Sequence, residues 1–222
     1  MSLVMHYLRI WDYTAAARVD HFVANSRTVQ NRIRKYYGRD STVIHPPVDV
    51  ERFQGESRSG DYYLCLSRLV GYKRIDVAVE AFSHSDRRLV VVGKGPDAEA
   101  LKSRAARNVE FVGEVSDEER DSLFLGCKAF LFPGEEDFGI VMAEAQAAGK
   151  PVIAYGKGGA TEIVVPDRTG VWFMEQTPKA LNAAIHAFEK QEDRFSPDVI
   201  RKHAQQFSRD RFDREFSDFV RT

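Results

Sequence analysis

The stretch from Ala129 to Tyr155, AFLFPGEEDFGIVMAEAQAAGKPVIAY, constrains the fold more than any other part of this 222-residue chain. The apolar run from Ala129 to Phe132 predicts a buried strand, and the alanine-rich segment after it predicts a helix that Gly149 ends. Pro151 then opens a second apolar strand. A strand, a loop, a helix and a second parallel strand form a βαβ unit. The loop should therefore lie at the carboxyl end of the sheet, where ligands bind in such folds.

Acidic residues in this stretch have a spacing that suits a binding site. Glu135, Glu136 and Asp137 crowd the loop, and Glu144 follows Glu136 by eight positions. Residues 140 and 144 share one face of a helix, so Glu144 can face the same crevice as the loop. One acid could then meet a reacting group while the other holds a pair of hydroxyls. The alternative is structural: acidic residues stabilise a helix N-terminus, and Glu144 is a solvated side chain.

Strands and helices alternate from Tyr62 onward, and this predicts an α/β fold with a Rossmann-like parallel sheet and helices on both faces. One of the predicted helices spans residues 98–107. A polar, glycine- and serine-containing run favours an interdomain linker at residues 47–61, before a Rossmann-like domain at 62–207. A helix–strand–helix–strand segment precedes the linker at 1–46, and a last helix follows at 208–222.

Composition excludes some classes of protein. Charged residues make up 29% of the chain and the formal net charge is −1, which argues against a dedicated nucleic-acid-binding protein. Cys65 and Cys127 both lie in apolar settings, so they are expected to be buried free thiols in a reducing, cytoplasmic compartment. No apolar run approaches the ~18 residues of a membrane span.

Basic residues follow the first strand of the predicted sheet. Arg68 and Lys73 come directly after this strand, and both side chains suit phosphate oxygens. This loop and the acidic loop should open at the same edge of the sheet, which predicts a diphosphate site there. The alternative is a solvated basic turn.

Two glycine-containing loops and the histidines complete the candidate sites. Residues 93–98, GKGPDA, formally match a dinucleotide fingerprint with Glu114 about twenty residues later, but Pro96 lacks the N–H that a pyrophosphate cradle uses. We interpret this loop as a tight turn beside a base or ribose. The segment 156–162, GKGGATE, could bring backbone N–H groups to an anion, although it lacks the Lys-Ser/Thr end of a P-loop. The histidines have no metal-ligand spacing, so no metal is expected.

Seven segments occur in the order seen in retaining glycosyltransferases of family 4: Asn25-Ser26, HPPVDVERF, SRLVGYKRID, VVGKGP, NVEFVGEVSDEE, FPGEEDFGIVMAEAQAAGKPVIA and GGATEIV. The resemblance covers about residues 7 to 175. It implies the GT-B fold, in which two Rossmann-like domains enclose a cleft. The opening HYLRIWDYTAAARVDHFVANS and the segment SRLVGYKRIDVAVEAF most resemble WbaZ-type mannosyltransferases, which implies GDP-mannose as the donor and a glycan or lipid-linked sugar as the acceptor.

The resemblance also implies roles for individual residues. Arg68 and Lys73 match the basic pair that grips the donor diphosphate. Glu136 matches the acid that faces the donor sugar near its anomeric carbon, and Glu144 matches the acid that binds the ribose hydroxyls. Backbone N–H groups are implied to meet the sugar and the β-phosphate at Asp137, Phe138, Gly139, Ile140 and Val141. Residues implied to border the base are Gly93, Gly95 and Val115. No cofactor or metal is expected, because a helix N-terminus with Arg and Lys can stabilise the departing diphosphate.

The resemblance also implies a domain organisation. Residues 1–46 would be a remnant of the acceptor-binding domain, and residues 208–222 would form a helix that crosses back to it. Such a fragment is expected to bind donor nucleotide and to transfer sugar poorly. In such a fragment, four apolar residues are expected to be either exposed or buried in a homodimer: Trp11, Phe212, Phe216 and Phe219. Peripheral association with the inner face of a membrane would belong to the other half of the protein.

Three alternatives stay open at this point. A non-catalytic nucleotide-sugar binding module would use the same donor residues. An NAD-dependent oxidoreductase would rest on residues 93–98 alone. A phosphorylase-like enzyme with pyridoxal phosphate would require a cofactor lysine, and no loop of this sequence marks one.

Overall fold

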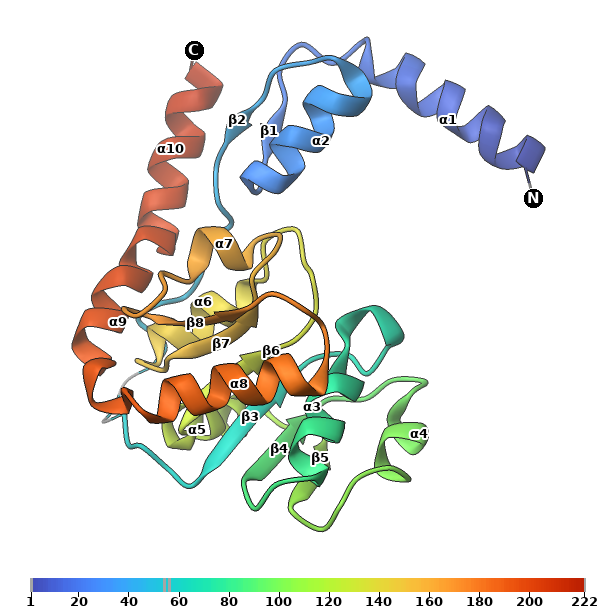
Figure 1. Ribbon diagram of the computed structural model, residues 1–222. Helices are drawn as coiled ribbons and strands as arrows, with labels where there is room; N and C mark the ends of the chain where they lie inside the picture. Colours follow the sequence, from blue (N-terminus) through green and yellow to red (C-terminus); the bar gives the residue numbers. More distant parts are fainter. Residues whose placement is uncertain (1, 54, 56, 222) are drawn as a thin grey trace.

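A six-stranded, all-parallel sheet forms the centre of the protein and confirms the predicted fold class (Figure 1). The computed structural model describes residues 2–53, 55 and 57–221. The strands of this sheet are β3 (Tyr62–Leu66), β4 (Arg88–Val92), β5 (Val109–Gly113), β6 (Ala129–Phe132), β7 (Val152–Tyr155) and β8 (Gly170–Phe173). Their order across the sheet is β5-β4-β3-β6-β7-β8. The direction of winding therefore reverses between β3 and β6, and ligands in such sheets bind at this reversal.

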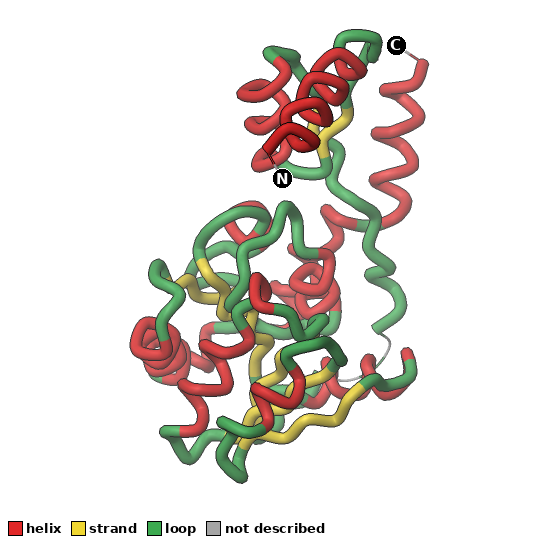
Figure 2. The backbone as a smooth tube through the Cα atoms, turned by 90° about the vertical axis from the view of Figure 1, so that its right-hand side faces the viewer, coloured by secondary structure: helices red, strands yellow, loops and turns green. Residues whose placement is uncertain are grey.

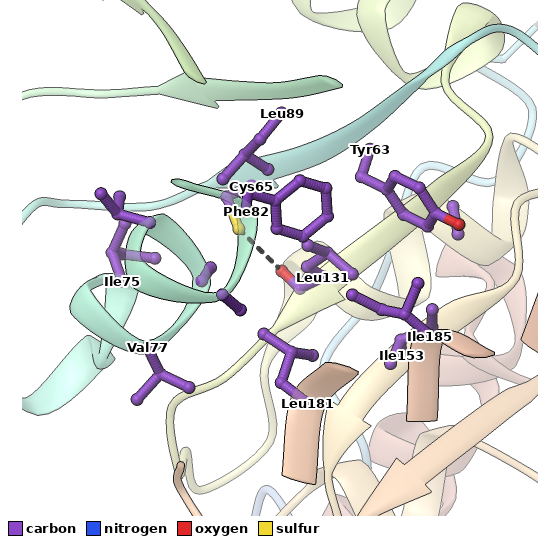
Figure 3. Close-up of a cluster of buried hydrophobic side chains, with 14 of the residues drawn as sticks. Tyr63, Cys65, Ile75, Val77, Phe82, Leu89, Leu131, Ile153, Leu181 and Ile185 are labelled. Atoms are coloured by element: carbon purple, nitrogen blue, oxygen red, sulfur yellow. Dashed lines mark hydrogen bonds between the residues drawn. The ribbon is translucent and has the colours of Figure 1, made fainter. Parts of the chain in front are cut away.

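Helices cover both faces of the sheet. They are α3 (Ile75–Ser83), α4 (Ala98–Lys102), α5 (Asp117–Gly126), α6 (Ile140–Ala147), α7 (Ala160–Ile163), α8 (Pro178–Glu189) and α9 (Pro197–Ala204), with short 3-10 turns η1 (Gly71–Lys73), η2 (Glu192–Arg194) and η3 (Gln205–Phe207). Alternate residues of β3 serve opposite faces: Tyr63 and Cys65 join the cluster under α3 and α8 (Figure 3), whereas Leu64 joins the cluster under α5 and α6. Burial on both faces explains why the strands are almost continuously apolar.

Both cysteines are buried free thiols, as predicted. Cys65 donates a weak hydrogen bond to the Leu131 carbonyl at 3.6 Å (Figure 3), and burial raises the pKa of both thiols.

Helix α4 is shorter than the sequence predicted, because it ends at Lys102 instead of residue 107. The side-chain amide of Asn108 donates to the carbonyls of Phe82, Ser85 and Arg87 at 2.8, 2.9 and 2.6 Å. These bonds hold Asn108, directly before β5, against the chain from the end of α3 to β4, and residues 103–108 form turns and loop instead of continuing the helix.

A small first unit precedes the sheet and consists of α1 (Ser2–Ala16), β1 (Val23–Ala24), α2 (Arg27–Tyr37) and β2 (Thr42–Val43). Its two strands pair in parallel. Ser26 caps α2 as predicted, accepting from the Val29 N–H at 3.2 Å. Helix α1 projects away from the sheet (Figure 1), and its Trp11 is 60% exposed. Within the described residues, no helix combines the length and apolarity that spanning a membrane requires.

The chain crosses between the first unit and the sheet twice, and the two crossings lie side by side. The Val48 N–H donates to the Phe207 carbonyl at 2.8 Å, and buried Arg211 donates to the His45 carbonyl at 2.9 Å. Arg211 belongs to α10 (Arg209–Arg221), which runs along the first unit (Figure 2), where Phe219 meets His21 with ring centroids 6.1 Å apart.

Candidate functional site

Two adjoining pockets open at the carboxyl ends of the central strands. The β3–β6 pocket has a volume of about 490 Å³ and is lined by Asn25, Pro46, Leu66, Ser67, Arg68, Lys73, Phe132, Glu136, Asp137, Phe138, Gly139, Ile140 and Val141. The β3–β4 pocket has a volume of about 900 Å³ and is lined by Leu66, Ser67, Arg68, Val92, Gly93, Lys94, Gly95, Glu114, Val115 and Arg120. Arg68 lies in both walls, at the junction of the pockets.

The structure thus gathers almost all the residues singled out from the sequence. The basic loop and the acidic loop meet in the β3–β6 pocket, and Gly93, Gly95 and Val115 lie in the β3–β4 pocket. Glu144 is the exception: among the described residues it belongs to neither wall, but its carboxylate lies 3.6 Å from Arg120, which lines the β3–β4 pocket. The reason for the gathering is topological, because parallel strands deliver their following loops to one edge of the sheet.

Lys73 and Glu136 form an ion pair inside the β3–β6 pocket. Their side chains are only 18% and 24% exposed, and burial lowers the pKa of Lys73. Lys73 ends the turn η1, and Glu136 comes from the loop after β6, so the pair joins the two loops across the sheet reversal. An anion that enters this pocket would compete with Glu136 for the Lys73 ammonium group.

Phe138 belongs to the wall of the β3–β6 pocket, and its ring is held by two other aromatic rings. Its side chain is 3% exposed and packs between His45 and Phe207, with ring centroids 5.2 and 5.5 Å away. This packing anchors the acidic loop just before Gly139, whose φ of 87° turns the chain into α6. The N-terminus of α6 therefore points toward the β3–β6 pocket, a favourable position for a negative charge.

The glycine-rich segment at residues 156–162 packs against the backbone of the acidic loop. This contact corrects the interpretation of the segment as a loop that binds an anion. Gly159 donates its N–H to the Glu136 carbonyl at 2.8 Å, and a Cβ on Gly159 would lie 1.9 Å from the Phe138 carbonyl oxygen. The two backbones touch, so a side chain has no room. In the part of the chain that the structure describes, this segment contributes no residue to the two pocket walls.

Close packing also explains the resemblance of residues 93–98 to a dinucleotide fingerprint. The Leu69 N–H donates to the Lys94 carbonyl at 2.9 Å, and a Cβ on Gly95 would lie 2.1 Å from the Leu69 carbonyl oxygen. The Glu114 carboxylate, which a dinucleotide ribose would need, pairs with the Lys94 ammonium group at 2.7 Å. Gly93 and Gly95 are therefore explained by the close contact between their loop and the loop after β3, without a bound dinucleotide.

Arg120 is a pocket residue that the sequence reasoning missed. It lies on α5 and lines the β3–β4 pocket, and its guanidinium is 3.6 Å from the Glu144 carboxylate. Burial raises the pKa of Glu144, and the charge of Arg120 opposes this shift. The signal in the sequence was weak: one basic residue directly after the three acidic residues 117–119.

Replacing the buried acid tests this pKa shift. A raised pKa means that the charged form of Glu144 is disfavoured in the folded protein, so its contribution to stability falls as pH rises through and above 4.5. We expect Glu144→Gln to unfold at the same or a higher temperature than the unchanged protein at pH 7, and this difference to vanish below about pH 4. Thermal unfolding across this pH range measures it. A Glu144→Gln variant that is less stable at pH 7 than at pH 4, relative to the unchanged protein, would contradict the prediction.

A buried carboxylate from α7 ties the first unit to the site. Glu162, with a side chain only 8% exposed, accepts from the backbone N–H of Arg27 at 2.9 Å and from Thr28 at 3.4 Å. It also meets His45 Nε2 at 3.0 Å. The same helix, α2, reaches the acidic loop through Arg32, which pairs with Asp137 at 2.5 Å. The position of α2 and the position of the acidic loop are therefore linked.

Glu162→Ala should loosen α2. The carboxylate satisfies N–H groups at the positive end of the helix, and the loss of such a cap costs about 1–2 kcal/mol of unfolding free energy. Urea unfolding measures this loss, and hydrogen exchange should quicken at the first amides of α2. Glu162→Gln keeps an acceptor oxygen, so we expect a smaller effect from it. Unchanged exchange in α2 would contradict this role.

The strand order, the sheet reversal and the charged pockets at that reversal are those of a Rossmann-like α/β domain. The backbone belongs to the GT-B class: HepE from Anabaena, solved in complex with UDP and glucose, has a TM-score of 0.84 at 19% identity, over 94% of this chain and 64% of that chain. Residues 48–208 match the family model of glycosyl transferases group 1, and residues 2–52 match that of glycosyltransferase family 4. The chain belongs to the glycosyl transferases group 1 family.

Two mannosyltransferases are similar to this chain in sequence. The GDP-mannose-dependent alpha-(1-6)-phosphatidylinositol monomannoside mannosyltransferase of Mycobacterium tuberculosis is 36% identical over 158 residues, covering 58% of this chain and 41% of the relative. The O-antigen chain mannosyltransferase C of Escherichia coli is 27% identical over 211 residues, covering 86% of this chain and 55% of the relative. The chain spans about half the length of the relatives it matches.

Proposed function

We propose that this chain supplies the donor site of a retaining glycosyltransferase that moves mannose from GDP-mannose to a glycan or lipid-linked acceptor. The observation that carries the proposal is the position of Arg68 at the junction of the two pockets, with the Lys73–Glu136 pair on one side and, on the other, a glycine-containing turn whose Lys94 is paired with Glu114. A diphosphate at this junction would direct its sugar into the β3–β6 pocket and its nucleoside into the β3–β4 pocket.

The charges of the site suit the departure of a nucleoside diphosphate. When the bond between the anomeric carbon and the phosphate oxygen breaks, negative charge grows on the diphosphate. In the proposal, Arg68, Lys73 and the N-terminus of α6 stabilise this charge without a metal; their common position in the wall of the β3–β6 pocket supports this assignment. Glu136 would face the sugar, and the proposal assigns it no nucleophilic role. Transfer on the same face of the sugar ring, assisted by the leaving phosphate, enters the proposal from the resemblance to retaining glycosyltransferases.

Mannose and guanine enter the proposal from the relatives. Two of them are named as mannosyltransferases, and one of these is named as dependent on GDP-mannose. The family assignment favours this proposal over the oxidoreductase and phosphorylase alternatives. A binding module without activity would use the same pockets, so nucleotide binding is the first property to test.

Calorimetric titration with GDP, UDP, ADP and NADH, followed by GDP-mannose, tests the proposal. We expect GDP to bind best and Arg68→Ala/Lys73→Ala to lose it. Tighter binding of UDP or ADP would keep the glycosyltransferase but replace the donor. Binding of NADH alone, unaffected by the double substitution, would overturn the proposal.

A further inference from the structure

Two arginines share one acidic pair on α5, and only one of them is well satisfied. Arg52 approaches Asp121 at 2.7 Å through Nε and donates to the Asp117 carbonyl at 3.1 Å. Arg120 lies 3.6 Å from the Asp117 carboxylate and 3.9 Å from that of Asp121. Arg52 therefore occupies the acids and leaves the donors of Arg120 with longer contacts.

The Arg120 guanidinium is held in place by charge but is short of hydrogen bonds. Its distance to the Glu144 carboxylate is 3.6 Å, beyond ordinary hydrogen-bond length. Its Nε is buried and, among the described residues, has no hydrogen-bond partner. The Arg120 side chain is 23% exposed and lines the β3–β4 pocket. Its contacts with the carboxylates of Asp117, Asp121 and Glu144 are all 3.6–3.9 Å long, so the guanidinium would gain from a ligand in the pocket that brings acceptor atoms within hydrogen-bond distance.

The position of Arg120 separates it from the phosphate end of the site. Lys73 and Glu136 line the β3–β6 pocket, Arg68 lies in both, and Arg120 lines the β3–β4 pocket beside Val115. A ligand with its diphosphate at Arg68 would place its nucleoside in the β3–β4 pocket. The guanidinium would then meet the base or the ribose rather than the phosphates.

The pattern of donors indicates which base fits. A guanidinium carries parallel N–H donors and no acceptor. The N7 and O6 atoms of guanine are adjacent acceptors that match this fork, whereas adenine offers N7 beside an amino group that is itself a donor.

We infer that Arg120 is a specificity-determining residue of the β3–β4 pocket, which selects guanine by donating hydrogen bonds to its N7 and O6 atoms. The inference rests on the proposed function, because it requires a nucleoside diphosphate in these pockets. The competing role is a positioning one, in which Arg120 only orients Glu144 against the ribose. That role would weaken all nucleotides equally, since they share the ribose.

Titration with GDP, ADP and 7-deaza-GDP separates these roles, because 7-deaza-GDP differs from GDP in losing the N7 acceptor. The unchanged protein should bind GDP roughly tenfold more tightly than either of the other two. In Arg120→Gln the three affinities should converge, mainly through loss of GDP binding. Arg107→Gln, an exposed arginine on the loop before β5, is the matched control and should keep the preference.

Each other outcome has a distinct meaning. Equal affinity of the unchanged protein for GDP and 7-deaza-GDP overturns the inference without any variant. Equal loss of all three ligands in Arg120→Gln assigns the positioning role instead. If Arg68→Ala abolishes GDP binding and Arg120→Gln leaves the preference intact, the inference fails while the proposed function stands. If no nucleoside diphosphate binds at all, the proposed function fails too.

Discussion

Gly159→Ala should destabilise the protein by roughly 3 kcal/mol, the upper end of the cost of overpacking, and should weaken GDP binding at the same time. The new Cβ would lie 1.9 Å from the Phe138 carbonyl oxygen and 2.4 Å from its Cα. Both are backbone atoms, so no side chain can swing away, and the acidic loop itself must move. That loop carries the Glu136 carboxylate that pairs with Lys73. Urea unfolding and GDP titration on one sample measure both effects.

Gly71→Ala is the matched control for this substitution. Its added Cβ would meet only a carboxylate oxygen of Asp97 at an ordinary 3.8 Å, and its φ is not in the left-handed region. We expect it to be neutral or slightly stabilising, since alanine reduces the freedom of the unfolded chain. Similar losses in Gly159→Ala and Gly71→Ala would show that the glycine-rich segment does not support the acidic loop.

Local pattern was sufficient to predict the sheet and the convergence of the main site residues. Apolar runs bounded by loops identified the strands of the sheet, and parallel topology alone brought Arg68 and Glu136 to one edge. The sequence pattern correctly predicted that Glu144 lies on α6. It did not predict that Arg120 lies next to Glu144. Pairing between Arg120 and Glu144 depends on how α5 packs against α6, which no periodicity reports.

Contacts between distant segments could not be derived from the sequence either. Glu162 caps α2 across 135 residues of sequence, and its position in GGATE gave no sign of this. The glycines of that same segment looked like ligand-binding glycines because close approach to an anion and close approach to another backbone require the same residue. The two cases differ only in what lies opposite the glycine. Opposite Gly158 and Gly159 lies the backbone of the acidic loop.

Lys73→Met should weaken GDP binding by about 10- to 150-fold, the value of one charge-assisted hydrogen bond, and should leave GMP binding nearly unchanged. Lys73 lines only the β3–β6 pocket, whereas Arg68 lies at the junction. A β-phosphate directed toward the β3–β6 pocket would therefore meet Lys73, and GMP has no such group. Arg68→Ala, by contrast, should weaken both nucleotides. Methionine keeps much of the apolar length of lysine, so the half-buried packing of the stem is largely retained.

Loss of Lys73 also leaves the Glu136 carboxylate without its partner, and this could shift the acidic loop by itself. Lys73→Met/Glu136→Gln removes both charges and separates the two causes. If GDP binding stays weak in the double variant while GMP binds normally, the lost contact is to the β-phosphate. If the double variant regains GDP binding, the single substitution acted through the loop. Lys179→Met serves as the control, because Lys179 is exposed on α8 and, among the described residues, belongs to neither pocket wall. An equal loss of GMP and GDP in Lys73→Met would contradict the orientation of the nucleotide that the two pockets imply.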